Sequence, residues 1–172
     1  MNGRLTWRAA TSRAEMGAAF DAEQRKVTEI LGIEAGYRYT GSPIVCDEDG
    51  DAPDPNNRAY VPTTWPGFRL PHVWLDDGTP LHDRLGFGYT LLALGSAPAD
   101  TSALEREVRA TGAPLDVLRV PDASAREIYG RDLVLVRPDL HVVWRGNAPP
   151  ADPQAVAATI TGRARSGHAV GV

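Results

Sequence analysis

The sequence predicts an α/β fold in which a βαβ unit is followed by a ββα unit around a mixed central sheet. After residue 79, apolar runs of strand length alternate with helical stretches. The last two runs are separated only by a short turn at residues 137–140, which makes them an antiparallel hairpin. Strands joined by a crossover helix are parallel, with a right-handed connection. This order is the plan of thioredoxin.

An N-terminal helix is expected at residues 12–31. Ser12 and Glu15 fit a capping box, in which both side chains satisfy free N–H groups of the first turn. Apolar residues then recur at helical spacing, and Gly32 is the expected stop.

The proline-rich segment, residues 60–75, connects this helix to the main domain. Its prolines at positions 62, 66 and 71 exclude a helix. We expect an extended chain that leads into a first strand at His72–Leu75, followed by a turn at residues 77–78.

The later elements follow from apolar runs, polar caps, prolines and glycines. The strands at 89–94 and 115–120 are continuous enough to be buried within a sheet. The remaining expected elements are a short helix at 80–85, helices at 101–111 and 123–129, hairpin strands at 133–136 and 141–144, and a last helix at 152–163. We therefore divide the chain into an N-terminal helix and linker (1–59), a thioredoxin-like domain (60–164) and a flexible tail (165–172).

Composition limits the class of protein. The 172 residues carry a net charge of −4, which argues against a nucleic-acid partner. The single cysteine excludes an internal disulfide. No apolar run approaches the roughly 20 residues that span a membrane, and the N-terminus has no apolar signal core. We expect a cytoplasmic protein with no membrane partner.

Several motifs resemble one known family. They are Tyr-Val-Pro at 60–62, Trp-Pro-Gly-Phe-Arg at 65–69, Pro-His-Val-Trp-Leu at 71–75 before Asp-Gly at 77–78, and residues 133–145 with their Arg-Pro-Asp turn. The region from about 20 to 163 resembles the C-terminal domain of FAD-dependent aromatic-ring hydroxylases, the para-hydroxybenzoate-hydroxylase-like monooxygenases that include phenol and polyketide hydroxylases. The resemblance implies a thioredoxin-like domain without redox cysteines, preceded by a helix that closes the flavin domain.

The sequence offers no catalytic, cofactor-binding or metal-binding residues. The place of the thioredoxin disulfide, residues 95–99, has no cysteine, and residues 130–132 lack the proline that faces it. No Gly-x-Gly-x-x-Gly motif follows an N-terminal strand, and the Gly-Phe-Gly at 86–88 is too short to hold a dinucleotide. FAD and NAD(P)H are implied only for the full-length family.

Cys46 and the acidic loop that follows it are candidate sites. The neighbouring acids would raise the thiol pKa, which favours an incidental cysteine over a peroxidatic one. Asp47, Asp49 and Asp51 alternate near Gly50, but the loop lacks the glycine and glutamate positions of a calcium-binding EF-hand. A solvated loop is the favoured interpretation.

The histidines share no metal-ligand spacing. His72 and His82 are expected to approach each other, with Asp76 or Asp83 nearby, and a structural role is favoured over acid–base or metal chemistry. The other two histidines, His141 and His168, lie in a hairpin strand and in the tail. Trp65, Trp74 and Trp144 are expected to be core or interface anchors.

The favoured function is that of a redox-inactive C-terminal hydroxylase domain with a structural or oligomerisation role and no catalysis alone. Its expected partner is the flavin domain of a hydroxylase or a second copy of itself. A free-standing thioredoxin-like accessory protein of a biosynthetic pathway is the alternative, and a peroxidase using Cys46 is the third hypothesis. The residues expected at a partner surface are Leu5, Trp7, Phe20, Trp65 and Phe68.

Overall fold

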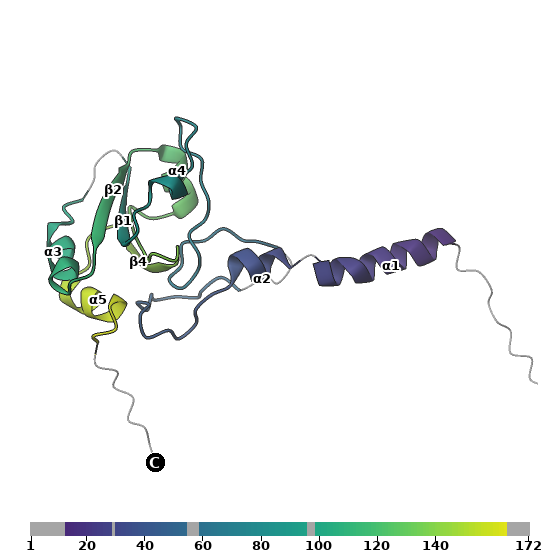
Figure 1. The fold of residues 1–172 in the computed structure, drawn as a ribbon, viewed down its shortest axis with the longest axis horizontal. Helices are drawn as coiled ribbons and strands as arrows, with labels where there is room; N and C mark the ends of the chain where they lie inside the picture. Colours follow the sequence, from purple (N-terminus) through teal and green to yellow (C-terminus); the bar gives the residue numbers. More distant parts are fainter. Residues whose placement is uncertain (1–12, 29, 55–58, 96–98, 165–172) are drawn as a thin grey trace, which may run out of the picture.

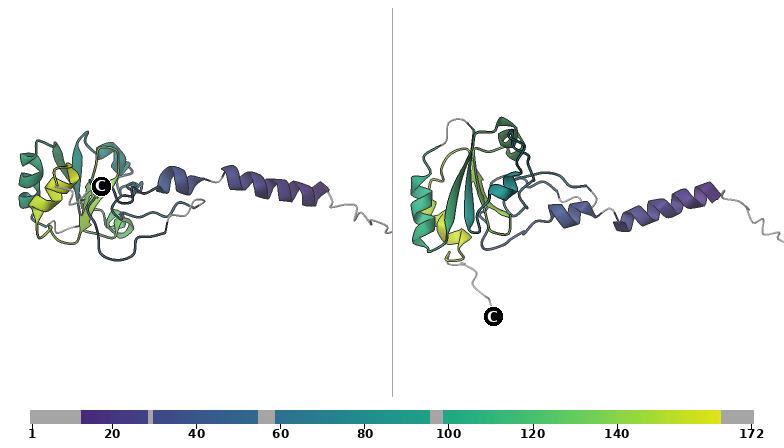
Figure 2. Two further views of the ribbon diagram at one scale, coloured as in Figure 1. Left: turned by 90° about the horizontal axis from the view of Figure 1, so that it is seen from below. Right: turned by 45° about the horizontal axis from the view of Figure 1, so that its top comes forward.

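The computed structural model describes residues 13–28, 30–54, 59–95 and 99–164. Its centre is a four-stranded sheet of order β2-β1-β3-β4 (Figures 1 and 2). β1 (Tyr89–Leu94) is parallel to β2 (Leu115–Val120) and antiparallel to β3 (Leu133–Val136), which is antiparallel to β4 (Val142–Gly146). The predicted thioredoxin-like plan with its mixed sheet is confirmed.

Helices cover both faces of this sheet (Figure 2). α3 (Ser102–Ala110) and α5 (Pro153–Ile160) lie on one face. The 3₁₀ helix η1 (Leu81–Arg84), α4 (Ala123–Tyr129) and the proline-rich segment lie on the other.

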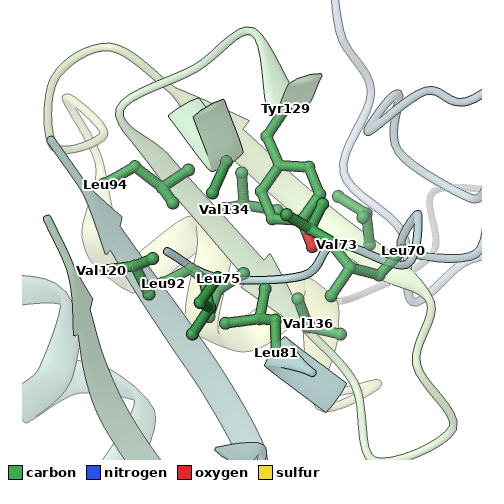
Figure 3. Close-up of a cluster of buried hydrophobic side chains, with 12 residues drawn as sticks. Leu70, Val73, Leu75, Leu81, Leu92, Leu94, Val120, Tyr129, Val134 and Val136 are labelled. Carbon is green, nitrogen blue, oxygen red and sulfur yellow. The ribbon is translucent and has the colours of Figure 1, made fainter. Parts of the chain in front are cut away.

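The strands alternate between two apolar cores, as the pleat of a strand requires. Leu91 packs toward α3 and α5, whereas its neighbour Leu92 packs toward the opposite layer. Figure 3 shows the second of these cores, where Leu70, Val73 and Leu81 meet the sheet. The proline-rich segment is therefore part of the hydrophobic core of the domain.

Two N-terminal helices precede the domain, whereas the sequence predicts one. α1 (Arg13–Thr28) and α2 (Leu31–Gly36) are separated at Ile30, whose φ of −115° and ψ of 21° are not helical. The predicted stop at Gly32 is wrong, because this residue lies inside α2. α1 extends away from the sheet domain in each view (Figures 1 and 2). Within the described ranges, no helix is long and apolar enough to cross a membrane.

The predicted strand at His72–Leu75 is also wrong. Trp74 makes only an isolated bridge with Pro80, and Val73 accepts one hydrogen bond from the backbone of Leu81. Val73 and Leu75 are buried against the face of the sheet, so this segment covers the sheet and does not extend its edge.

The predicted burial of β2 is correct only at its two ends, because β2 is an edge strand.

A partly buried ion-pair network connects the linker to the domain. Glu48 accepts hydrogen bonds from Arg145 Nε at 2.6 Å and Nη2 at 2.9 Å, and from Arg131 Nη2 at 2.9 Å. Arg145 also donates to Thr64 Oγ1 at 3.1 Å, and its guanidinium lies 4.9 Å from the centre of the Trp65 ring. The arginine side chain is only 9% exposed. We call these five residues the Glu48 clamp.

Burial alone would raise the pKa of the Glu48 carboxyl. The hydrogen bonds and charges of Arg145 and Arg131 outweigh that effect and hold this pKa below its ordinary value. Glu48 is therefore an ionised partner at neutral pH.

Glu48→Gln is expected to lower the free energy of unfolding by about 3 kcal/mol, because it leaves the Arg145 charge buried without a carboxylate. Urea unfolding of the whole chain measures this loss. Glu107→Gln is the matched control, since the Glu107–Arg106 pair is largely exposed on the arginine side, and it should cost less than about 1 kcal/mol. Equal losses in the two variants would show that the clamp contributes no more than a surface pair.

The N-cap of α4 supplies a second test. Asp122 Oδ1 accepts the Ala125 N–H at 2.8 Å, and Oδ2 accepts the Asp76 N–H at 2.7 Å. Asp122→Ala should therefore cost about 2 kcal/mol in urea unfolding, whereas Asp152→Ala, which removes only the cap of α5, should cost about 1 kcal/mol.

The contribution of Asp122 is also expected to depend on pH. Hydrogen bonds from Ala125, Ser124 and Asp76 lower the pKa of its carboxyl to about 2. Because the folded-state pKa lies below the unfolded one, the stabilisation is present above about pH 4 and is lost as the pH falls through 2. The stability difference between the parent chain and Asp122→Asn should shrink over that range. A difference that is constant with pH would contradict this assignment.

Candidate docking face

The position of the thioredoxin disulfide carries no thiol. β1 ends at Leu94, the next described residues after Gly95 begin at Ala99, and α3 starts at Ser102. None of residues 95–102 is cysteine. Thr101, at the start of α3, donates its hydroxyl to Glu105 at 2.7 Å. The chain therefore lacks the dithiol that disulfide exchange requires.

The glycines at 86–88 do not form a phosphate cradle. A Cβ on Gly86 would lie 2.0 Å from Asp116 Oδ2, and a Cβ on Gly88 would lie 2.6 Å from the Pro114 carbonyl oxygen. These glycines allow two parts of the domain to pack closely, and the carboxylate beside Gly86 would repel a phosphate. The residues at this position do not fit a bound dinucleotide such as FAD.

Cys46 lies in a groove of about 720 Å³ between the linker and α5, whose walls include Trp144 and Val156. Its N–H donates to the Val143 carbonyl at 2.9 Å, and its side chain packs against the core beneath α3 and α5. Burial, and then the charge of Asp47, raise the pKa of the thiol to about 11. At neutral pH the group is a thiol, which is a poor nucleophile.

The structure brings His72 and His82 together, as the sequence indicated. Their ring centres are 5.2 Å apart, and the Trp74 ring lies 5.1 Å from His72. Burial, and then the charge of His72, lower the pKa of His82, while Asp83 acts in the opposite direction. Within the described ranges, no three metal-ligating side chains form a group, either here or around Asp47. His168 lies outside the described residues.

An aromatic cluster lies where α2 meets the domain. The rings of Tyr37 and Tyr39 are 5.3 Å apart and lie 5.1 and 4.6 Å from the ring of His141. The Arg137 guanidinium lies 5.1 Å from the Tyr39 ring centre. We call these four residues the tyrosine cluster. Both tyrosine side chains are exposed, whereas the histidine is buried.

The charges around the tyrosine cluster are compensated. Arg137 forms a two-point ion pair with Asp139, whose carboxyl pKa falls to about 2 mainly through the hydrogen bond from this arginine. Burial lowers the pKa of His141, which is therefore neutral at pH 7. Its Nδ1 lies 3.1 Å from the Asp139 carbonyl oxygen, which can only accept a hydrogen bond, so Nδ1 carries the proton.

Backbone contacts hold the tyrosines on the domain. The Tyr39 N–H donates to the Gly67 carbonyl at 3.1 Å, and Arg38 Nε donates to the Pro66 carbonyl at 3.3 Å. Gly67 has a φ of 93°, and a Cβ there would lie 3.0 Å from the Tyr39 carbonyl oxygen. Only glycine fits this approach without strain.

Two further exposed apolar side chains lie on or beside α2. Val61 lines a shallow depression with Gly32 and Gly36 of α2, and Ile33 on the same helix is 48% exposed. We define the α2 face as Ile33, Tyr37, Tyr39 and Val61.

The residues expected at a partner surface differ in their exposure. Phe20 is exposed on α1, but Trp65 and Phe68 are only 9% and 4% exposed, so placing them at the surface was wrong. Arg145 lies over the Trp65 ring and Arg38 lies over the Phe68 ring, which closes both from solvent. Leu5 and Trp7 lie outside the described residues.

The other two tryptophans differ from each other. Trp74 is exposed, whereas Trp144 is partly buried against the core beneath α3 and α5. Sequence reasoning missed Tyr37 and Tyr39 as surface residues. Their alternation around Arg38 in an extended segment was the available signal.

Comparisons with known proteins agree with this architecture. The family model described as "Aromatic-ring hydroxylase, C-terminal" matches residues 63–164. The FAD-dependent monooxygenase apdD of Emericella nidulans is 38% identical over 134 residues, which are 74% of this chain and 22% of that protein. Phenol 2-monooxygenase of a Pseudomonas strain is 31% identical over 163 residues, 84% of this chain and 26% of that protein.

Solved structures give the same result. The rebeccamycin biosynthetic enzyme RebC with reduced flavin matches with a TM-score of 0.72 and 32% identity, over 88% of this chain and 28% of that one. The chain thus spans about a quarter of the length of the proteins it matches. Together these matches show that the chain belongs to the C-terminal domain family of the aromatic-ring hydroxylases.

Proposed function

We propose that the chain acts as a redox-inactive structural domain that packs against the flavin domain of an aromatic-ring hydroxylase. The observation that carries this proposal is the combination of a thioredoxin-like domain without thiols at its redox position and an exposed apolar surface around α2. A dithiol fold without cysteines has no disulfide chemistry to offer, whereas exposed apolar surface marks an interaction site.

The complete enzyme would carry out flavin-dependent hydroxylation of an aromatic ring, using NAD(P)H and oxygen. The names of the relatives support this class, since they include phenol 2-monooxygenase and a putative polyketide hydroxylase of Streptomyces coelicolor. In this proposal FAD and the substrate bind to parts of the enzyme that these 172 residues do not contain, and the location is the cytoplasm. The residues of this chain position and stabilise the flavin domain.

A free-standing accessory protein of a biosynthetic pathway is the alternative. The Glu48 clamp supports this alternative. Its ion pairs join the linker to the domain, as expected of a chain that folds without the rest of a hydroxylase. Adding a separately expressed flavin domain distinguishes the two. An accessory protein should form no complex with the added flavin domain, whereas a hydroxylase domain should bind to it.

The chain is predicted not to bind flavin. After incubation with excess FAD and desalting, it should show no flavin absorption band, because atoms of Asp116 and Pro114 occupy the space beside the glycines at 86 and 88. Stoichiometric flavin retained on the protein would contradict the proposal and would require a cofactor site in this chain.

Cys46 is predicted to be a poorly reactive thiol, which would argue against the peroxidase hypothesis. Because the thiol pKa is about 11, iodoacetamide alkylation at pH 7 should be much slower than that of free cysteine and should accelerate up to about pH 11. Cys46→Ser should leave peroxide consumption at the level of the buffer. Peroxide turnover that disappears in this variant would establish a peroxidase and remove the structural proposal.

A further inference from the structure

We propose that the α2 face (Ile33, Tyr37, Tyr39 and Val61) is the surface on which the flavin domain of the hydroxylase sits. This inference rests on the proposed function and specifies which side of the domain makes the contact.

Exposed apolar side chains are concentrated in the part of the chain before residue 62. Among the described residues, six of the nine exposed large hydrophobic side chains lie between positions 16 and 61. These six are Met16, Phe20, Ile33, Tyr37, Tyr39 and Val61. The helices α3 and α5, which cover the far face of the sheet, contribute none of the nine. The outer surface of α3 and α5 therefore has the character of a solvated face, and the α2 face does not.

The tyrosine cluster has the composition and rigidity of an interface anchor. Tyrosine and arginine are enriched among residues that dominate binding energy. Tyr39 is held by its backbone bond to Gly67, by the His141 ring and by Arg137. Because these contacts already fix the ring, little conformational entropy remains to be lost on binding.

The tyrosine cluster can also be covered without leaving the Arg137 charge unpaired. Arg137, whose guanidinium lies against the Tyr39 ring, is 12% exposed and bonded to Asp139. Asp139 is 45% exposed and lies at the rim, where water can still reach it. Burying a compensated centre within a polar rim is the usual arrangement of a protein–protein interface.

Chain connectivity identifies the occupant. α2 leads within three residues to α1, where Met16 and Phe20 are exposed one helical turn apart. In the matched family this domain is the C-terminal part of the enzyme, so the chain before it belongs to the FAD-binding part. A partner tethered through α1 is presented to the α2 face at high effective concentration, which a second copy is not.

A chimera tests the proposal. This chain replaces the matching 134-residue region of the Emericella monooxygenase, and purified chimeras are compared for retained FAD and for the midpoint of thermal unfolding. Val61→Asp places a charge in the α2 face, and Ile128→Asp places the same charge on α4, where the side chain is exposed to a similar extent, 46% against 49%. Both variants are also made in the isolated chain.

We expect both isolated variants to unfold within about 2 °C of the parent chain, because surface substitutions have small effects. In the chimera, Val61→Asp should lower the midpoint by about 5 °C and reduce the retained FAD, while Ile128→Asp should do neither. Tyr37→Ala should act like Val61→Asp, and Phe87→Ala, which also removes an exposed aromatic ring, should act like Ile128→Asp.

Failure of the proposed function and failure of the α2 face would give different results in these experiments. A parent chimera that retains no FAD would overturn the proposed function, and the α2 face with it. A sound chimera in which Val61→Asp and Ile128→Asp behave alike would overturn the α2 face and leave the proposed function standing. An isolated chain that sediments as a dimer, and as a monomer after Val61→Asp, would show that a second copy is the occupant.

Discussion

The ion pair between Glu48 and Arg145 is the interaction on which the rest of this structure depends. It joins the linker to the last strand across 97 positions of sequence, and Arg131 and Thr64 bring the α4–β3 connection and the proline-rich segment to the same point. Separating the two partners is costly, since each would then be an uncompensated and partly buried charge. The linker is consequently held against the domain, and α2 is held next to the tyrosine cluster.

The thioredoxin-like scaffold lacks the thiols of a redox enzyme at the corresponding position. In a redox enzyme the end of β1 and the start of α3 hold a reactive thiol. In this chain Thr101 and Glu105 hydrogen-bond each other at that place. Its single thiol, Cys46, lies beside β4, where its N–H donates to the Val143 carbonyl, and the pKa of this thiol is raised. The proline-rich segment meanwhile covers the face of the sheet through Leu70 and Val73, and delivers Gly67 to the backbone of Tyr39.

Sequence patterns predicted the sheet well because β1 and β3 are continuous apolar runs buried on both sides. They failed at His72–Leu75. Buried and exposed side chains alternate there as in a strand, but the segment covers the face of the sheet and does not pair along its edge. The break of the N-terminal helix at Ile30 carries no local signal, because neither proline nor glycine occupies that position. Glu48 was missed because an acidic loop has the composition of a solvated one, and its arginine partners lie 83 and 97 residues further along the chain.

Amide hydrogen exchange, compared between the isolated chain and the chimera that carries the flavin domain, is the most direct test of the contact at the α2 face. We predict that amides of residues 30–39 and 59–61 become more protected in the chimera, while those of α3 and α5 stay unchanged. Equal exchange throughout would mean that the flavin domain does not contact the α2 face. New protection confined to α3 and α5 would place the contact on the opposite side of the sheet and contradict the central claim.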